Sequence, residues 1–223
     1  MRMNQLGPNQ NSKFGQQASI PSNASVTFRE IISFLKTLAV LVVIAMILRG
    51  SVVEAFKIPS GSMIPTLMIG DHILVSKFSY GLRLPFVSDT IYRYGAPERG
   101  DIVVFTKPDD EATLEDESGI NIIKRVIGLP GDTVEVRGTN VYINNQIYSE
   151  PYARWEAGGL RDGDFGPSKI PAEHVLLLGD NRDHSRDSRF WNDPYLSMDR
   201  IKGRALIIYW SWESLGRIGQ LIK

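Results

Sequence analysis

Two serines flank a glycine in the segment Ile58–Leu67, with a proline before the first serine and another after the second. The prolines restrict the backbone and Gly61 permits tight turning, so the segment is a poor helix and a poor strand. A constrained turn can present the hydroxyl of Ser60 or Ser62 to a substrate. The alternative is an ordinary linker after the apolar run Ile31–Leu48.

A serine hydroxyl is a weak nucleophile and needs a base, for which Lys124 and His184 are the candidates. Lys124 lies in the apolar run Ile120–Ile127. If this run is a strand, Lys124 and Arg125 place one cation on each face. A lysine in an apolar setting loses its proton more readily and can then act as a general base. The alternative is a lysine that protects an edge strand.

The segment Gly179–Arg189 is dense in turn-forming residues and alternating charges, directly after the apolar run His174–Leu178. Such a loop can supply a hydroxyl that orients a base, and Asp/Arg pairs that hold it. A Ser–His–Asp arrangement through His184 is also conceivable, and the spacing does not choose between His184 and Lys124. The alternative is a charged surface turn.

Short β-branched or aromatic runs, separated by Gly, Pro, Asp and Asn, predict a mostly β domain beyond residue 70. The segment 138–140 predicts a hairpin turn. Two loops, Lys107–Gly119 and Glu150–Ile170, are predicted to be solvated excursions rather than sites. The predicted strands are His72–Phe78, Asp101–Thr106, Ile120–Ile127, Thr133–Arg137, Asn140–Tyr148, His174–Leu178 and Ala205–Trp210.

The N-terminal part predicts a flexible tail over 1–27 and a transmembrane anchor over 28–50. Eighteen helical residues span roughly 27 Å, near the lower limit for a bilayer. A cleaved signal peptide and a buried helix are the alternatives. Charges flank the run on both sides, so the positive-inside rule does not give its orientation.

The composition fits a membrane-anchored protein with a globular domain. The chain has 223 residues, 43% of them hydrophobic, with 25 basic and 25 acidic side chains, so bulk charge indicates no nucleic-acid partner. It has no cysteine, which excludes disulfides, thiolate metal sites and a cysteine nucleophile. The three histidines have no metal-ligand spacing, and we expect neither a metal nor another cofactor.

Five segments in order resemble the bacterial type I signal peptidases, or leader peptidases, which are membrane-bound Ser–Lys endopeptidases. The resemblance runs from about Leu48 to the C-terminus. It implies a signal-peptidase-like antiparallel β-sheet catalytic domain over 51–223, with a small insertion near 149–170, behind a single N-terminal transmembrane helix. The five segments are 59–67, 70–75, 99–105, 123–132 and 179–191.

The resemblance also implies roles for single residues. Ser62 would be the nucleophile and Lys124 the general base. The Ser60 hydroxyl and the Ser62 N–H would form the oxyanion hole. Ser185 would orient the Lys124 amine, and Asp187 and Arg189 would pair to support that wall of the site, while His184 would be a bystander.

The implied substrates are signal peptides of exported preproteins, cut after small residues as in Ala-x-Ala. The peptide would lie extended as an added strand. The resemblance implies a single-pass protein of the bacterial cytoplasmic (inner) membrane. Its catalytic domain would lie on the outer (periplasmic) face, near lipid and the secretion translocon. Trp210 and Trp212 would touch lipid or be ordinary core aromatics. The implied pocket residues are Phe56, Ile58, Pro59, Met63, Leu67, Val104, Ile122 and Ile123.

Two other classes of protein compete with this prediction. A non-catalytic β module tethered to a membrane would tolerate loss of Ser62 or Lys124, whereas this sequence has both, together with Ser60 and Ser185. A self-cleaving regulator of the LexA type would share the Ser–Lys chemistry and a related β core. It would need a DNA-binding domain where this sequence has an apolar run.

Overall fold

A computed structural model describes residues 23–82, 92–106, 120–156 and 164–223. The chain divides into two compact units, residues 1–44 and 45–223. The predicted acidic loop Lys107–Gly119 lies outside the described residues, as do residues 1–22 of the predicted tail.

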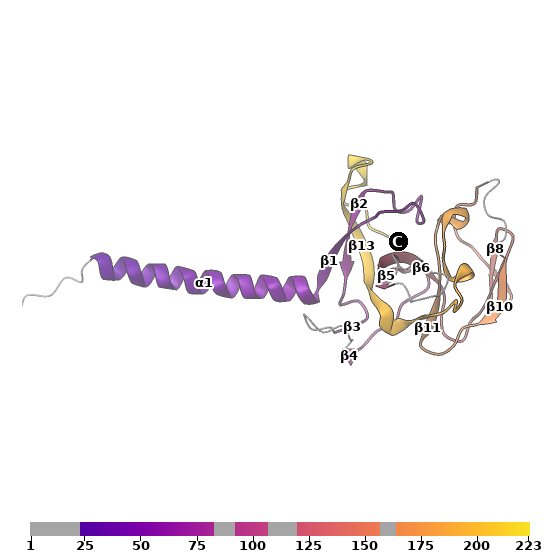
Figure 1. The fold of residues 1–223 in the computed structure, drawn as a ribbon, viewed down its shortest axis with the longest axis horizontal. Helices are drawn as coiled ribbons and strands as arrows, with labels where there is room; N and C mark the ends of the chain where they lie inside the picture. The colour runs from indigo at the N-terminus through magenta and orange to yellow at the C-terminus, as the bar shows by residue number, and fades with distance from the viewer. Residues whose placement is uncertain (1–22, 83–91, 107–119, 157–163) are drawn as a thin grey trace, which may run out of the picture. The chain divides into compact units, whose positions relative to one another are not determined.

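The N-terminal element is helix α1 (Asn23–Ser51), which includes the last residues of the predicted tail (Figure 1). Its sequence contains no proline, and its one glycine, Gly50, stands next to its end, so nothing interrupts the backbone hydrogen bonds. In the described part of the chain, no helix combines the length and the apolar character that a membrane crossing requires. The helix over 28–50 is therefore observed, and the transmembrane anchor stays a prediction.

Seven antiparallel strands form the main sheet, in the order β1-β2-β13-β5-β6-β11-β12 (Figure 1). Strand β6 carries Lys124 and lies between β5 and β11, in the interior of the sheet. The strands in chain order are β1 (Val53–Lys57), β2 (Asp71–Ser76), β5 (Ile102–Thr106), β6 (Asn121–Gly128), β11 (His174–Leu178), β12 (Leu196–Ser197) and β13 (Ile201–Ser211).

A second, four-stranded antiparallel sheet has the order β10-β7-β8-β9, and a short pair is formed by β3 (Gly81–Leu82) and β4 (Tyr92–Arg93). The elements of the second sheet are β7 (Thr133–Arg137), β8 (Asn140–Ile143), β9 (Gln146–Tyr148) and β10 (Phe165–Lys169). Short 3₁₀ helices complete the described part: η2 (Arg182–His184), η3 (Ser188–Phe190), η4 (Met198–Arg200) and η5 (Leu215–Arg217).

The mostly β prediction is confirmed, and each predicted strand has a counterpart within a few residues. The run Asn140–Tyr148 is two strands rather than one. Asn144 and Asn145 have positive φ angles of 52° and 65°, which asparagine tolerates, and they form the turn between β8 and β9. The predicted turn at 138–140 joins β7 to β8.

Three clusters of buried apolar side chains hold the sheets together. The first contains Ile58, Met63 and Leu67 together with strand residues such as Val104 and Ile123. The second contains side chains of β5, β6, β11 and β13. The third joins β6 and β11 to the four-stranded sheet. Each buried side chain of this size contributes about 1.5–3 kcal/mol, so these clusters carry most of the favourable free energy of folding.

An ion pair between Asp71 and Arg217 ties the first residue of β2 to η5. Asp71 is fully buried, and its Oδ2 lies 2.7 Å from Arg217 Nη2 and accepts the Met68 N–H at 2.9 Å. Arg217 Nη2 also donates to the Thr66 carbonyl at 2.9 Å. Burial alone would raise the pKa of Asp71, but hydrogen bonds from Arg217, Ser211 and Met68 outweigh it and hold this pKa below its ordinary value of 3.8.

Replacing Asp71 by Asn should lower the free energy of unfolding by about 2 kcal/mol near neutral pH. The folded-state pKa is depressed, so the ionised carboxylate stabilises the fold above its ordinary pKa, and this stabilisation is lost as the pH falls through the folded value. The difference between wild type and Asp71→Asn in urea unfolding should therefore shrink from pH 6 to pH 3.

The matched control for this variant is Asp199→Asn. Asp199 pairs with Arg93 on the surface, where an ion pair contributes little. It should change stability by less than about 1 kcal/mol at either pH. If Asp71→Asn lowers the free energy of unfolding by the same amount at pH 6 and at pH 3, the negative charge of Asp71 does not stabilise the fold.

Candidate active site

The nucleophile turn, residues 58–67, follows β1 and is anchored by its apolar side chains. Ile58, Met63 and Leu67 are fully buried in the first cluster, and Ile58 pairs with the chain before β2 through two backbone hydrogen bonds. These anchors leave Ser62 at the inner side of the turn and Ser60 exposed. The turn is therefore a rigid support for two hydroxyls rather than a linker.

The Lys124 amine lies 2.7 Å from Ser62 Oγ and 3.1 Å from the Ile123 carbonyl oxygen. Both side chains are buried, with 5% of Lys124 and 7% of Ser62 exposed. The alternative of a lysine that protects a sheet edge is wrong, because such a lysine faces solvent whereas the Lys124 side chain is buried. A buried amine within hydrogen-bond distance of a serine hydroxyl is the arrangement that general-base activation of a nucleophile requires.

The structure does not bring His184 to Ser62. His184 is exposed, and its Nε2 lies 3.0 Å from Glu156 Oε2. The Ser–His–Asp alternative therefore has no geometric support, whereas the Ser62–Lys124 pair has.

The loop 179–189 packs directly against the nucleophile turn at Gly179 and Ser185. A Cβ at Gly179 would lie 2.2 Å from Ser185 Oγ and 2.6 Å from the Ser62 carbonyl oxygen. Ser185 Oγ is buried and makes no hydrogen bond within the described part of the chain. The contact with the Lys124 amine that the resemblance implies is therefore not formed here, and an orienting role for Ser185 stays a prediction.

Asp187 and Arg189 form a buried ion pair with Nε 2.8 Å from Oδ1. Asp187 Oδ2 accepts the Gly179 N–H at 2.9 Å, and Arg189 Nη2 donates to the Arg182 carbonyl at 2.6 Å. The expected pairing of Asp187 with Arg189 is thus observed, and it fixes the backbone of the loop on both sides of Ser185.

Asn181 is a residue that the sequence did not single out. Its backbone N–H donates to the Ser62 carbonyl at 3.1 Å, and its Nδ2 donates to the Gly61 carbonyl at 3.1 Å. Asparagine in a turn-rich loop is common, so the sequence held no signal that separates Asn181 from its neighbours.

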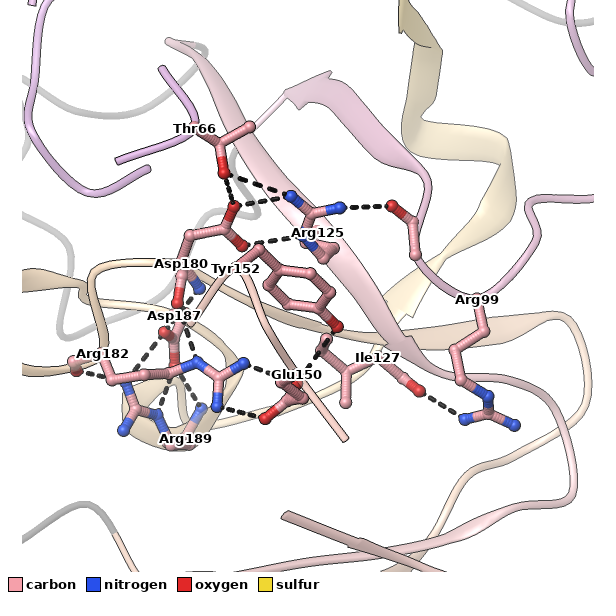
Figure 2. A network of polar contacts seen from close by, with 12 residues as sticks. Thr66, Arg99, Arg125, Ile127, Glu150, Tyr152, Asp180, Arg182, Asp187 and Arg189 are labelled. Carbon is pink, nitrogen blue, oxygen red and sulfur yellow. Dashed lines mark hydrogen bonds and ion pairs between the residues drawn. The ribbon is translucent and has the colours of Figure 1, made fainter. Parts of the chain in front are cut away.

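Arg125, on the strand next to Lys124, is the centre of the network in Figure 2. Its side chain is 1% exposed; Nε and Nη2 donate to Asp180 at 2.8 and 2.6 Å, and Nη1 donates to the Gly100 carbonyl at 2.8 Å. Thr66 of the nucleophile turn donates its hydroxyl to Asp180 Oδ2 at 2.5 Å. The guanidinium also lies 3.7 Å from the centre of the Tyr152 ring. The network therefore joins the turn, β6 and the loop.

The predicted solvated loop Glu150–Ile170 is in part a structural support, which corrects that prediction. Glu150 binds both terminal nitrogens of buried Arg182 at 2.6 and 2.7 Å, as Figure 2 shows. Arg182 Nε donates to the Gly179 carbonyl at 3.0 Å. Arg154 exchanges backbone hydrogen bonds with Asp180 and Arg182. Residues 150–154 thus hold the loop through the contacts of Glu150 and Arg154, while residues 157–163 lie outside the described part.

Most of the predicted pocket residues lie together in the first apolar cluster. Ile122 instead packs against the second cluster, because it lies on the opposite face of β6 from Ile123. Pro59 is exposed beside the serines. Of the predicted pocket residues, Ile58, Met63, Leu67, Val104 and Ile123 belong to the first cluster, and Phe56 packs against it.

Replacing Gly179 by Ala should lower the free energy of unfolding by about 1–3 kcal/mol, because the added methyl group overlaps Ser185 Oγ and the Ser62 carbonyl. It should also slow acylation of Ser62 by a serine-directed reagent, since the turn must shift. Urea unfolding and the acylation rate measure the two effects.

Gly216→Ala is the matched control, since the nearest atom to its Cβ would be Ser214 Oγ at 3.6 Å. This variant should keep both stability and reactivity. A Gly179→Ala protein that equals the control in both measurements would contradict the packing described above.

Comparisons with known proteins identify the family of this chain. Residues 31–210 match the model of the family described as signal peptidase, peptidase S26. A signal peptidase I from Pseudomonas aeruginosa is 39% identical over 202 residues, covering 76% of this chain and 69% of that protein. A signal peptidase I from Leptolyngbya laminosa is 41% identical over 187 residues, covering 83% and 82%.

Among solved structures, a signal peptidase I from Enterococcus faecalis is 32% identical, with coverage of 48% of this chain and 95% of that chain and a TM-score of 0.40. That score is too low to support an inference about the fold, and the family assignment depends on the sequence matches. The chain belongs to the signal peptidase family of S26 peptidases.

Proposed function

We propose that this chain is a serine endopeptidase that removes N-terminal signal peptides from exported preproteins, with Ser62 as the nucleophile and Lys124 as the general base. The observation that carries the proposal is the distance of 2.7 Å between the Lys124 amine and Ser62 Oγ in a buried setting. The family assignment supports the substrate class.

In the proposed mechanism Ser62 Oγ attacks the scissile carbonyl carbon while its proton passes to the neutral amine of Lys124. Burial of the amine disfavours its charged form before the reaction. The oxygen that becomes negative accepts hydrogen bonds from the Ser62 N–H and the Ser60 hydroxyl. The intermediate then collapses, Lys124 gives the proton to the leaving amine, and the acyl group stays on Ser62.

Deacylation repeats these steps with water as the nucleophile. Lys124 takes a proton from the water, which attacks the acyl carbon. The second tetrahedral intermediate then collapses to the free carboxyl group of the product, and Lys124 returns the proton to the departing Ser62 Oγ. Ser185 in this proposal helps to orient the Lys124 amine, and Asp187 and Arg189 hold the backbone around it. Ser185 Oγ is buried and makes no hydrogen bond in the described part of the chain, so its hydroxyl is available to the Lys124 amine in this proposal.

The apolar side chains around the nucleophile turn support a preference for small residues one and three positions before the cut. Met63, Leu67, Val104 and Ile123 are almost fully buried, so little room remains beside them for a substrate side chain larger than a methyl group. The Ala-x-Ala preference is proposed on this basis, with the peptide extended as an added strand against residues 120–124 and 56–60.

The proposal places the catalytic domain at the outer face of the bacterial cytoplasmic membrane, with α1 as a single anchor. The apolar run Ile31–Leu48 within α1 supports it. Exposed Trp212 and partly exposed Trp210 are compatible with contact to lipid, since tryptophan is favoured at membrane interfaces. The secretion translocon remains an expected neighbour.

Cleavage of a preprotein with an Ala-x-Ala site by the full chain in detergent tests the proposal. Wild type should cut after the second small residue. Ser62→Ala and Lys124→Ala should each lower turnover by more than about 10³-fold, because neither residue alone can form the acyl-enzyme. The cleaved product is identified by mass spectrometry.

His184→Ala is the control for the base and should keep most of the activity, since His184 binds Glu156 rather than Ser62. Circular dichroism shows whether each variant is folded. Loss of activity in His184→Ala with retention in Lys124→Ala would replace the mechanism by a Ser–His one. A folded wild type that cuts no preprotein would favour a non-catalytic module.

A further inference from the structure

Asn181 makes two contacts with the nucleophile turn that the proposed Ser62–Lys124 chemistry does not use. Its backbone N–H holds the Ser62 carbonyl and its side-chain amide holds the Gly61 carbonyl, each at 3.1 Å. The side chain is 5% exposed. An amide buried to this extent and directed at the backbone of the turn can fix the orientation of peptide groups there.

The Gly61 carbonyl and the Ser62 N–H belong to one planar peptide group. This peptide is trans, since the cis bonds of the described chain are Ile64–Pro65 and Gly166–Pro167. In a trans peptide the C=O and N–H point in opposite directions, so an interaction that holds the oxygen also fixes the direction of the N–H. The Asn181 amide therefore controls where the Ser62 N–H points.

The Gly61 carbonyl accepts a second hydrogen bond, from the Ile64 N–H at 3.2 Å. A carbonyl oxygen has two lone pairs, so Asn181 and Ile64 together use both. Hydrogen bonds in series polarise one another, and a peptide whose oxygen accepts two bonds is a stronger donor at its nitrogen. Asn181 thus both orients the Ser62 N–H and increases its strength as a donor.

We propose that Asn181 is a positioning residue for the oxyanion hole. This inference depends on the proposed function, in which the Ser62 N–H donates to the oxyanion of the tetrahedral intermediate. The other proposed donor, the Ser60 hydroxyl, rotates about its C–O bond and is on an exposed residue. The Ser62 N–H is therefore the donor that the fold can orient in advance, and the Asn181 side chain orients it.

Three buried arginine–carboxylate pairs already hold the loop that carries Asn181. Asp180 binds Arg125, Arg182 binds Glu150 and Asp187 binds Arg189. The Asn181 backbone N–H remains in any side-chain variant. Loss of the side-chain amide should therefore leave the loop in place and change chiefly the Gly61–Ser62 peptide.

Two variants, Asn181→Ala and Asn181→Asp, test the proposal in the full chain with a preprotein substrate. Aspartate has the shape of asparagine, but its carboxylate cannot donate to the Gly61 carbonyl. The Asn181→Asp variant therefore tests the role of the amide donor even if Asn181→Ala does not fold. Both should lower kcat on the order of 10- to 100-fold, somewhat less than removal of an oxyanion donor, with KM changed by less than about threefold.

A peptide aldehyde with an Ala-x-Ala sequence provides a second measurement. Ser62 Oγ adds to its carbonyl carbon and forms a tetrahedral adduct whose oxygen occupies the oxyanion hole. If Asn181 acts through this hole, the inhibition constant should rise in each variant by about the factor by which kcat/KM falls. A general loss of stability would not produce this parallel change.

Asp183→Ala is the matched control, because Asp183 is in the same loop and is also 5% exposed, while its carboxylate accepts the Glu156 N–H instead of touching the turn. It should keep kcat and aldehyde affinity. The proposal is overturned if Asn181→Asp keeps the wild-type kcat, or if kcat falls while aldehyde affinity stays unchanged. If the proposed function itself is wrong, the folded wild type will neither cut the preprotein nor bind the aldehyde, whatever the Asn181 variants do.

Discussion

The complete burial of the Arg125 guanidinium is the constraint on which the rest of the site depends. A buried positive charge is costly unless its donors are paired. Asp180 provides two acceptors and the Gly100 carbonyl a third. The guanidinium also lies over the aromatic ring of Tyr152. Asp180 must therefore lie beside β6, and the loop that begins at Gly179 must start there too.

Once the loop is fixed in this way, its small residues can lie close to the nucleophile turn. Gly179 allows contact distances that no other residue would allow, because the Ser62 carbonyl and Ser185 both lie where the Cβ of another residue would be. Thr66 closes the connection by donating to Asp180. The Ser62 turn and the loop are therefore positioned by the same carboxylate, and a change at Asp180 would disturb both.

The sequence predicted the elements whose signal is local. Apolar runs bounded by turn residues identified β6 and β11, and the period of a strand correctly placed Lys124 and Arg125 on different faces. The serine turn and Lys124 were candidates because of their residue types, but a linker, an edge-strand lysine and His184 remained alternatives until the resemblance to the signal peptidases selected Ser62 and Lys124. Strand β10 was missed, since Gly166 and Pro167 are weak strand formers that pair only because a neighbouring strand is present.

The role of residues 150–154 could not be predicted for a related reason. Glu150 and Tyr152 look like solvent-exposed residues in sequence, and only the fold shows that Glu150 neutralises Arg182 and that Tyr152 lies against Arg125. Asn181 is similar, because its importance depends on which carbonyl it faces. A contact between residues far apart in the chain leaves no pattern in the sequence around either residue, whereas a buried strand or helix face leaves a periodic pattern of apolar residues.

The register of β6 links these observations to function. Val103 of β5 pairs with Lys124 and Ile102 with Arg125. A slip by one residue would exchange the faces of the strand and bring a guanidinium to Ser62 in place of an amine. Arginine stays protonated in proteins and cannot act as a base, whereas a buried lysine can lose its proton. Because only Arg125 satisfies the bidentate geometry at Asp180, the ion pair that stabilises the fold also selects the register in which Lys124 reaches the serine.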